Sequence, residues 1–303
     1  MQLLYIMDAY GTEKGITNPV NELQKQLDKT TELFFFLVYY LTETARYVET
    51  DALVRGNKHL PSEDDLNVNT KLAGNTLLWQ ILEMPGYDKL KEDFLPQQKL
   101  DKDLLKKTYL QLVATNEYQE YIAVQSREAA QEKQILQFIF TNLLLLNDDF
   151  NSYIEELFAN WDDDCELMVQ LVHALLQGPK KFQLSQMLTD EKWQFAKSLL
   201  ITTYNKKTHL QELISPKLNN WDAERIATID LIILQMGIAE FLYFETIPAR
   251  VTINEYIDIA KDYSTAQSGQ FVNGVLDNIH KELVQNNQLQ KIAYKSKTAK
   301  GEV

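Results

Sequence analysis

The hydrophobic positions between residues 20 and 48 recur at alternating steps of three and four. They are Val20, Leu23, Leu27, Thr30, Phe34, Leu37, Leu41, Thr44 and Val48. This spacing places them along one stripe of an α-helix. Asn18-Pro19 supplies a start, because asparagine caps a helix and proline fits its first turn. The pattern predicts one helix from Pro19 to about Gly56, packed inside this chain rather than in an intermolecular coiled coil.

A second helical series runs from about Asp101 to Asn147. It places Ile135, Phe138, Ile139, Asn142 and Leu146 on one face. Between the two series, residues 56–75 are rich in Gly, Asn, Ser and Asp, which is typical of a loop or an internal boundary. Asn147 is expected to start a further helix.

Residues 161–180, WDDDCELMVQLVHALLQGPK, allow a metal site or ordinary helix ends. The acidic residues, together with Cys165 and His173, are residue types that bind metal ions and favour a metal site. However, Asp163 and Glu166 have the spacing of a capping box, and acids favour the positive end of a helix. Gly178 is typical of a helix stop. Capping accounts for these residues, so we predict no metal site here.

Three apolar patterns follow in the last third of the chain. Residues 198–218 predict an amphipathic helix that ends near Ser215-Pro216. Residues 221–244 are apolar almost all round, which predicts a buried central helix. Residues 251–261 carry Thr252 and Glu255 at capping-box spacing, with Val251 and Tyr256 as a hydrophobic staple.

The stretch QSGQFVNGVLDNIH at 267–280 begins the last predicted helix. Its apolar positions are Phe271, Val272, Val275, Leu276, Ile279 and Leu283. Gly274 lies in the second turn, where glycine costs about 1 kcal/mol relative to alanine. A glycine in this place suggests that another backbone or a ligand comes close. We therefore predict a close helix contact at Gly274.

Composition agrees with an all-α fold. Glycine and proline number 10 and 7 of 303 residues, below the average usage of about 12%. The single cysteine excludes an internal disulfide and fits a reducing cytosol. The N-terminus lacks the features of a secretory signal. The longest apolar run, residues 33–41, is shorter than the roughly 18 residues of a membrane span. We expect a cytoplasmic protein with no membrane association.

The net charge of −13 is unevenly distributed. Residues 1–190 hold 17 Lys and Arg against 30 Asp and Glu, whereas residues 191–303 hold 13 of each. An RNA partner is therefore expected on the second part rather than the first. No phosphate-binding glycine loop, nucleophile elbow or histidine pair at metal spacing is found. We predict no catalytic residues, no metal, no cofactor and no enzymatic activity.

Three segments carry a family resemblance. ERIATIDLIILQMGIAEF, IPARVTINEYIDIAK and QFVNGVLDNI follow in this order between residues 191 and 285. Each is weak alone, but together the chain resembles the transcription antitermination factor NusB. MQLLY at the start is similar to the first helix of that family. Residues 15–190 resemble the long insertion of a Bacteroidetes-like branch, and their role is not indicated.

The resemblance implies an all-α, non-enzymatic protein built as a NusB-like helical bundle with an added helical region. It implies binding of boxA-type ribosomal RNA leader sequences together with the ribosomal protein NusE. The complex would join RNA polymerase and other Nus factors and promote read-through. The alternative is a helical scaffold that binds proteins only.

The resemblance also assigns residues. The implied RNA contacts are Gln2, Tyr5, Lys261, Gln270, Phe271 and Asn273. For Phe271 the choice is between stacking on a base and plain core packing. Asp230 and Glu240 are implied to contact NusE, with a buried hydrogen bond to a neighbouring helix as the alternative for each. Gly274, Thr252 and Glu255 are predicted to be structural.

One departure from the family concerns basic charge. The family has an arginine-rich segment before its MQLLY-like helix, so we expect the native start to lie upstream of Met1. Positions 267 and 270 are glutamine where an acid and a lysine are common. We therefore expect weak binding of RNA by this chain.

The domain organisation follows from the same patterns. We expect helical residues 1–190 with an acidic insertion, a NusB-like module at 191–285, and a flexible basic tail at 286–303. Because every predicted helix has an apolar face to bury, a single compact body is expected.

Overall fold

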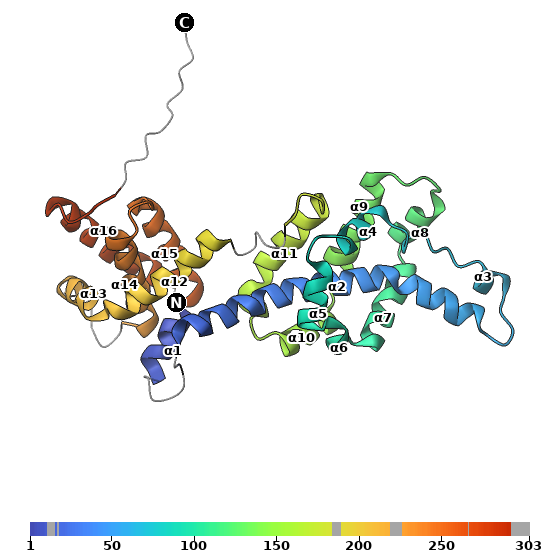
Figure 1. Ribbon diagram of the computed structural model, residues 1–303, viewed down its shortest axis with the longest axis horizontal. Helices are drawn as coiled ribbons and strands as arrows, with labels where there is room; N and C mark the ends of the chain where they lie inside the picture. The colour runs from blue at the N-terminus through green and yellow to red at the C-terminus, as the bar shows by residue number, and fades with distance from the viewer. Residues whose placement is uncertain (11–15, 17, 184–188, 219–225, 266, 292–303) are drawn as a thin grey trace, which may run out of the picture. The chain divides into compact units, whose positions relative to one another are not determined.

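The computed structural model describes residues 1–10, 16, 18–183, 189–218, 226–265 and 267–291 (Figure 1). Regular structure in these ranges consists of helices, with no β-strand, which confirms the all-α prediction. The chain divides into two compact units rather than the expected single body. Unit 1 comprises Met1–Gln24 and Asp190–Val303, and unit 2 comprises Lys25–Thr189. Within the described ranges, no helix has the length and apolar character needed to cross a membrane.

Unit 1 is built around one central helix. Its elements are α1 (Gln2–Tyr10), the first turn and a half of α2 (Pro19–Gly56), α12 (Asp190–Asn205), α13 (Lys207–Ile214), the short 3₁₀ turn η4 (Ser215–Leu218), α14 (Thr228–Tyr243), α15 (Ala249–Tyr263) and α16 (Ser268–Gln285). α14 packs against α1, α12, α13, α15 and α16. It is buried on nearly all sides between Ile232 and Phe241, which confirms the predicted central helix.

The close helix contact of unit 1 is at Gly237, not at Gly274. A Cβ built on Gly237 would lie 3.0 Å from Leu276 Cδ2 and 3.4 Å from Tyr256 Cδ2. A Cβ on Gly274 would have no neighbour within 4 Å, and Gly274 is exposed. The prediction for Gly274 is therefore wrong. The glycine that permits close packing lies on α14, opposite the core face of α16.

Several helix boundaries differ from the predictions. The helix predicted from residue 221 begins at Thr228, after extended backbone at Ala227, while residues 221–225 lie outside the described residues. The helix predicted over 198–218 is two helices, separated at Lys206 by non-helical backbone. α15 begins directly after Pro248, so Thr252 is inside the helix and is not its N-cap.

The end of α16 is a well-defined stop. Asn287 has a left-handed φ of 51°, and the Gln288 amide donates to the Leu283 carbonyl at 2.8 Å. The Asn287 amide donates to Val284, which completes the hydrogen-bond pattern of a Schellman motif. Lys291 then donates to the carbonyls of Glu240 and Phe244 at the end of α14. The predicted tail is thus anchored up to Lys291, and residues 292–303 lie outside the described residues.

Unit 2 contains the remainder of α2 and a series of shorter helices. These are α3 (Glu63–Leu66), α4 (Thr76–Leu82), α5 (Tyr87–Phe94), α6 (Pro96–Lys99), α7 (Lys102–Val113), α8 (Asn116–Ala123), α9 (Ala129–Phe138), the π-helical turn η2 (Ile139–Leu144), α10 (Asp148–Leu157) and α11 (Trp161–Gln177). α2 begins as predicted, because the Asn18 side chain accepts from the amides of Val20 and Asn21. It also ends at the predicted Gly56.

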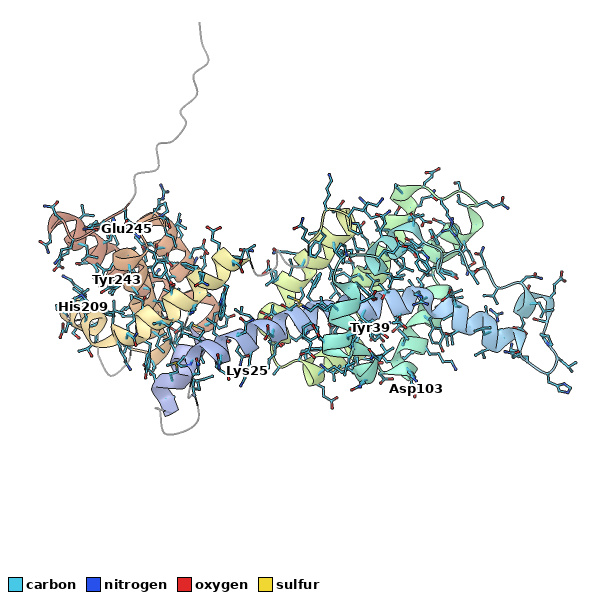
Figure 2. The ribbon with its side chains drawn as sticks, viewed as in Figure 1. Lys25, Tyr39, Asp103, His209, Tyr243 and Glu245 are labelled. Carbon is cyan, nitrogen blue, oxygen red and sulfur yellow. The ribbon has the colours of Figure 1, made fainter. Side chains whose placement is uncertain are left out.

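The middle of α2 is buried on all sides rather than along one stripe. Every residue from Leu33 to Thr42 is buried. Aromatic side chains surround it: the Phe35 ring meets Tyr87 edge-on at 5.1 Å, and the Tyr40 ring meets Phe150 at 4.8 Å. Tyr39, labelled in Figure 2, is also buried. The predicted single apolar stripe therefore understates the burial of α2, because the other helices of unit 2 enclose it on every side.

The predicted helix over 101–147 is interrupted and ends in a π-helical turn. Ile135 and Ile139 are buried as predicted, but Asn142 and Leu146 are exposed. In η2 the Leu145 amide donates to the Phe140 carbonyl five residues earlier. This wider turn shifts the residues that follow it, so that Leu144 enters the core instead.

The helix ends of α10 and α11 test the capping predictions. Asn147 caps α10 as predicted, accepting from the amides of Asp149 and Phe150. α11 begins at Trp161, so Asp163 lies in its first turn and the predicted capping box is wrong. Its first-turn acids still lie at the positive end of the helix, and Gly178 is the C-cap as predicted.

Candidate nucleic-acid interface

Three of the predicted RNA-contacting side chains lie where α15 meets α16. Lys261 belongs to the last turn of α15, and Gln270 and Asn273 belong to the first two turns of α16; all three are exposed. Lys261 crosses the start of α16 because Gly269 has no side chain. A Cβ on Gly269 would lie 3.0 Å from Lys261 Cγ. The structure therefore places Lys261 beside the first turn of α16, which carries Gln270, and Asn273 is exposed about one turn further along α16.

Lys261, and Lys281 further along α16, are each held in an exposed ion pair. Lys261 Nζ donates to Asp258 Oδ1 at 2.7 Å, and Lys281 Nζ donates to Asp277 Oδ2 at 2.6 Å. Exposed pairs of this kind contribute about 0–1 kcal/mol, so a phosphate group can replace the carboxylate at little cost. Lys261 remains usable as a phosphate contact.

Gln2 and Tyr5 come from a different helix of unit 1. α1 buries Leu3 and Leu4 and packs on α14, which leaves Gln2 exposed and Tyr5 41% exposed. Lys207 Nζ donates to Asp8 Oδ1 at 2.6 Å, which ties α1 to α13. Tyr5 thus presents part of an aromatic ring on a helix that is held at two places.

Phe271 presents no exposed ring face. It is 4% exposed and packs in the unit 1 core with Val272 and Val275. The core-packing alternative describes it, and the expectation of a free stacking surface at Phe271 is wrong in this structure. Its neighbours Gln270 and Asn273 point outward because α16 is amphipathic at this point.

Asp230 lies at the start of α14 and is 5% exposed. Its Oδ2 accepts from Ser268 Oγ at 2.8 Å, and Ser268 is in the first turn of α16. Ser268 also accepts from the Thr265 amide at 3.2 Å. Asp230 therefore joins α14 to the loop before α16, which is the buried hydrogen bond weighed as the alternative. Its other oxygen, Oδ1, is buried without a hydrogen-bond partner.

Glu240 forms the equivalent link at the other end of α14. Its carboxylate accepts from Thr252 Oγ1 at 2.6 Å and from the Tyr256 hydroxyl at 3.2 Å, both on α15. Burial, together with the neighbouring Glu240 carboxylate, raises the pKa of Tyr256 well above its usual value. Thr252 is buried and makes this bond instead of the predicted capping box. Glu255 is exposed on α15 and forms no capping box with it.

Sequence reasoning missed Gly237, Gly269, Ser268 and Lys291. Gly237 had a signal, because a glycine inside a helix that is apolar all round requires a reason. Lys291 had none, since it reaches the end of α14 from a segment without a periodic pattern. In the part of the chain that the structure describes, no three His, Cys, Asp or Glu side chains are grouped to hold a metal ion.

Comparison with known proteins points to one family. Residues 166–281 match the model of the NusB family. The transcription antitermination protein NusB of Salinibacter ruber is 38% identical over 140 residues, covering 46% of this chain and 82% of that protein. That of Clostridium botulinum is 46% identical over 88 residues, covering 29% of this chain and 66% of that protein. A solved structure of T. maritima NusB is 32% identical, covers 35% of this chain and 80% of that one, and has a TM-score of 0.30.

Because a relative at 38% identity is matched over most of its length, this chain belongs to the NusB family.

Proposed function

We propose that this chain is a transcription antitermination factor that binds boxA-type RNA leader sequences together with NusE. It would join RNA polymerase with other Nus factors and promote read-through. Membership of the NusB family, whose members are non-enzymatic regulators, supports the antitermination role. The observation that supports RNA binding is the exposure of Lys261, Gln270 and Asn273 together at the α15–α16 junction.

The physical roles follow from exposure. Tyr5 takes the place of Phe271 as the stacking surface, since its ring is accessible and Phe271 is in the core. Lys261 supplies a phosphate contact, and Gln270 and Asn273 supply amide donors and acceptors for base edges. Phe271 acts beneath them by fixing the start of α16 to the core.

The NusE contact is the second part of the proposal. Asp230 and Glu240 are buried, so their influence on NusE would come through the positions of α15 and α16 rather than through a broad direct contact. The acidic chain, with a net charge of −13, attracts a basic ribosomal protein at long range.

The test is titration of boxA-type RNA in the presence of NusE at two salt concentrations. Tyr5→Ala should weaken RNA binding by about 1–3 kcal/mol, the range for loss of one stacked base. Lys261→Gln should reduce the log–log salt slope by about 0.7, as expected for one phosphate contact on a single strand. Lys89→Gln, at an exposed lysine of unit 2, is the matched control and should change neither quantity.

The competing function is a protein-binding scaffold without RNA binding. It predicts that NusE binds equally well with and without RNA, and that Tyr5→Ala and Lys261→Gln behave like Lys89→Gln. That result would reject the RNA-binding proposal. RNA binding by the unaltered chain and by Lys89→Gln, together with weaker binding by Tyr5→Ala and Lys261→Gln, would support the RNA-binding proposal.

A further inference from the structure

Unit 2 contains a cavity of about 660 Å³ bordered by α8, α9, η2 and α11. The volume lies within the range of about 300–1,000 Å³ that is usual for small-ligand pockets. None of the described residues that line it is a lysine or arginine. The lining includes the carboxylates of Glu117 and Glu120 and the rings of Tyr121 and Phe138.

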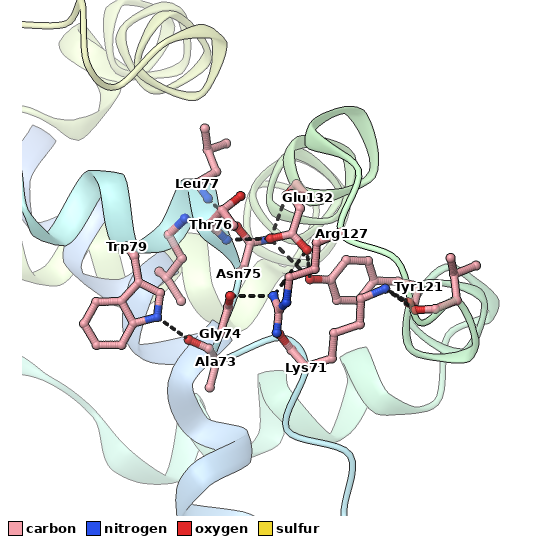
Figure 3. Close-up of polar contacts among 12 residues, drawn as sticks. Lys71, Ala73, Gly74, Asn75, Thr76, Leu77, Trp79, Tyr121, Arg127 and Glu132 are labelled. Carbon is pink, nitrogen blue, oxygen red and sulfur yellow. Dashed lines mark hydrogen bonds and ion pairs between the residues drawn. The ribbon is translucent and has the colours of Figure 1, made fainter.

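One wall of the cavity is held rigidly by a buried polar network, shown in Figure 3. The Tyr121 hydroxyl donates to Glu132 Oε1 at 2.8 Å, and the Thr76 amide donates to Glu132 Oε2 at 2.5 Å. Asn75 Nδ2 donates to the Glu132 carbonyl at 2.8 Å. Because Glu132 is 1% exposed, this network fixes the Tyr121 ring where it lines the cavity.

The cations near this wall are already engaged. Arg127 Nη1 donates to the Gly74 carbonyl and lies 3.5 Å from Glu132 Oε1. Lys71 Nζ donates to the carbonyls of Tyr121 and Val124. By contrast, Glu117 and Glu120 have no ion-pair partner among the described residues. With Arg127 paired to Glu132, the two carboxylates of Glu117 and Glu120 exceed the single charge of Lys71, so this side of the cavity keeps an excess of negative charge.

One residue of the lining has a buried acceptor without a donor. Gln131 lines the cavity, and Gln131 Oε1 is buried without a hydrogen-bond partner. Such an atom calls for a donor from water or from a ligand. The π-helical turn η2 adds Thr141 to the lining, and π-turns inside helices are frequent at functional sites.

We propose that this cavity binds an arginine side chain from a basic protein segment. A guanidinium carries planar N–H donors that suit carboxylates and an amide carbonyl, and it stacks on aromatic rings. All three features occur in the lining: Glu117 with Glu120, Gln131, and Phe138. Unit 2 holds 16 Lys and Arg against 26 Asp and Glu, a field that attracts a basic protein. The site lies in unit 2 and goes beyond the RNA-binding role proposed for unit 1.

The experiment uses fluorescence anisotropy with the full chain. The probe is a labelled peptide of alternating arginine and serine, and the matched probe replaces each arginine with neutral citrulline. The arginine peptide should bind at least about tenfold more tightly, as expected when a charged hydrogen-bonding group is lost. The double variant E117Q/E120Q should lose a similar factor. E155Q/E156Q, which removes two exposed acids of α10, is the control and should change the affinity by less than about twofold.

A second variant separates binding from folding. Asn142→Trp, at an exposed position of η2 that lines the cavity, should abolish peptide binding while the melting temperature is kept. Equal binding of both peptides, or equal loss in E155Q/E156Q, would overturn the proposal by showing diffuse attraction. Tighter binding of spermidine than of peptide, lost in E117Q/E120Q, would overturn the assignment to a protein side chain. The affinity of E117Q/E120Q for boxA-type RNA should equal that of the unaltered chain, whatever the Tyr5→Ala and Lys261→Gln variants of unit 1 show.

Discussion

The two units each enclose a central helix, but they do so with different side chains. In unit 1, α14 uses Gly237 to let Leu276 of α16 come close. In unit 2, α2 presents a run of aromatic residues that neighbouring helices meet with rings of their own, such as Tyr87 and Phe150. A glycine lets two helices approach closely but lowers the helix propensity of its own helix. Contacts between aromatic rings bury more apolar area, but they take tyrosine hydroxyls out of water.

The difference extends to titratable groups. Burial raises the pKa of many tyrosines in unit 2: Tyr39, Tyr40, Tyr47, Tyr87, Tyr109, Tyr118, Tyr121 and Tyr153. For Tyr39 the value reaches about 12. In unit 1, burial raises the pKa of Tyr256. The two units should therefore respond differently to alkali.

The largest expected effect is alkaline unfolding of unit 2. A tyrosine whose pKa is raised in the folded state stabilises the fold below its unfolded value of about 10. That stability is lost as the pH rises through the folded pKa, about 12 for Tyr39. Unit 2 should thus unfold cooperatively over this range while unit 1 persists to higher pH.

Tryptophan fluorescence can follow each unit separately. A W193F/W221F variant keeps Trp79 and Trp161 as reporters of unit 2, and W79F/W161F keeps reporters of unit 1. The two pairs should show transitions at different pH. Coincident transitions would mean that the units do not differ in this respect, and the comparison would fail.

The second prediction concerns the aromatic core of unit 2. Phe36 is 1% exposed and its ring lies 5.3 Å from that of Phe158. Phe36→Ala should reduce the free energy of unfolding of unit 2 by about 3–5 kcal/mol, because it leaves a cavity in a packed core. Urea unfolding of the W193F/W221F background measures this. Leu53→Ala, at a 67% exposed position of the same helix, is the control and should have little effect.

Sequence pattern predicted helices and their burial better than it predicted particular contacts. α2 was expected as a long helix with one apolar stripe and α14 as a helix apolar almost all round, because local periodicity reports which side chains avoid water. The pattern could not show that Leu33–Thr42 is enclosed on every side, since that depends on helices far away in the sequence. It likewise could not show which of two helices supplies the glycine at a close contact.

The candidate interface shows the same limit. Lys261, Gln270 and Asn273 were assigned by resemblance, and the structure leaves them exposed. Phe271 was assigned by the same resemblance and is in the core. The helical repeat does not distinguish an aromatic residue inside a core from one at the edge of that core. Both lie on the apolar face of the helix, and a shift of one turn along the helix axis moves the ring from the core to its edge.

The third prediction returns to the glycine contact of unit 1. Gly237→Leu should destabilise this unit, because even a Cβ would lie 3.0 Å from Leu276 Cδ2. Overpacking costs about 1–3 kcal/mol, which exceeds the gain of about 1 kcal/mol in helix propensity. Thermal unfolding of the W79F/W161F background measures the change. A higher melting temperature for Gly237→Leu would contradict this prediction. It would show that α16 can move away from α14 without loss of stability, so that α14 needs no glycine at this position.

The smallest expected effect has the opposite sign and concerns Gly274, on the solvent side of α16. A Cβ added at Gly274 would meet no atom within 4 Å, so a larger side chain there meets solvent. Gly274→Leu should therefore stabilise unit 1 by up to about 1 kcal/mol, since leucine is a far better helix former than glycine. The matched pair isolates packing, because the two substitutions are chemically identical and differ only in surroundings. Loss of stability at Gly274 would place a second close contact on α16 and would restore the role that the sequence first suggested for this glycine.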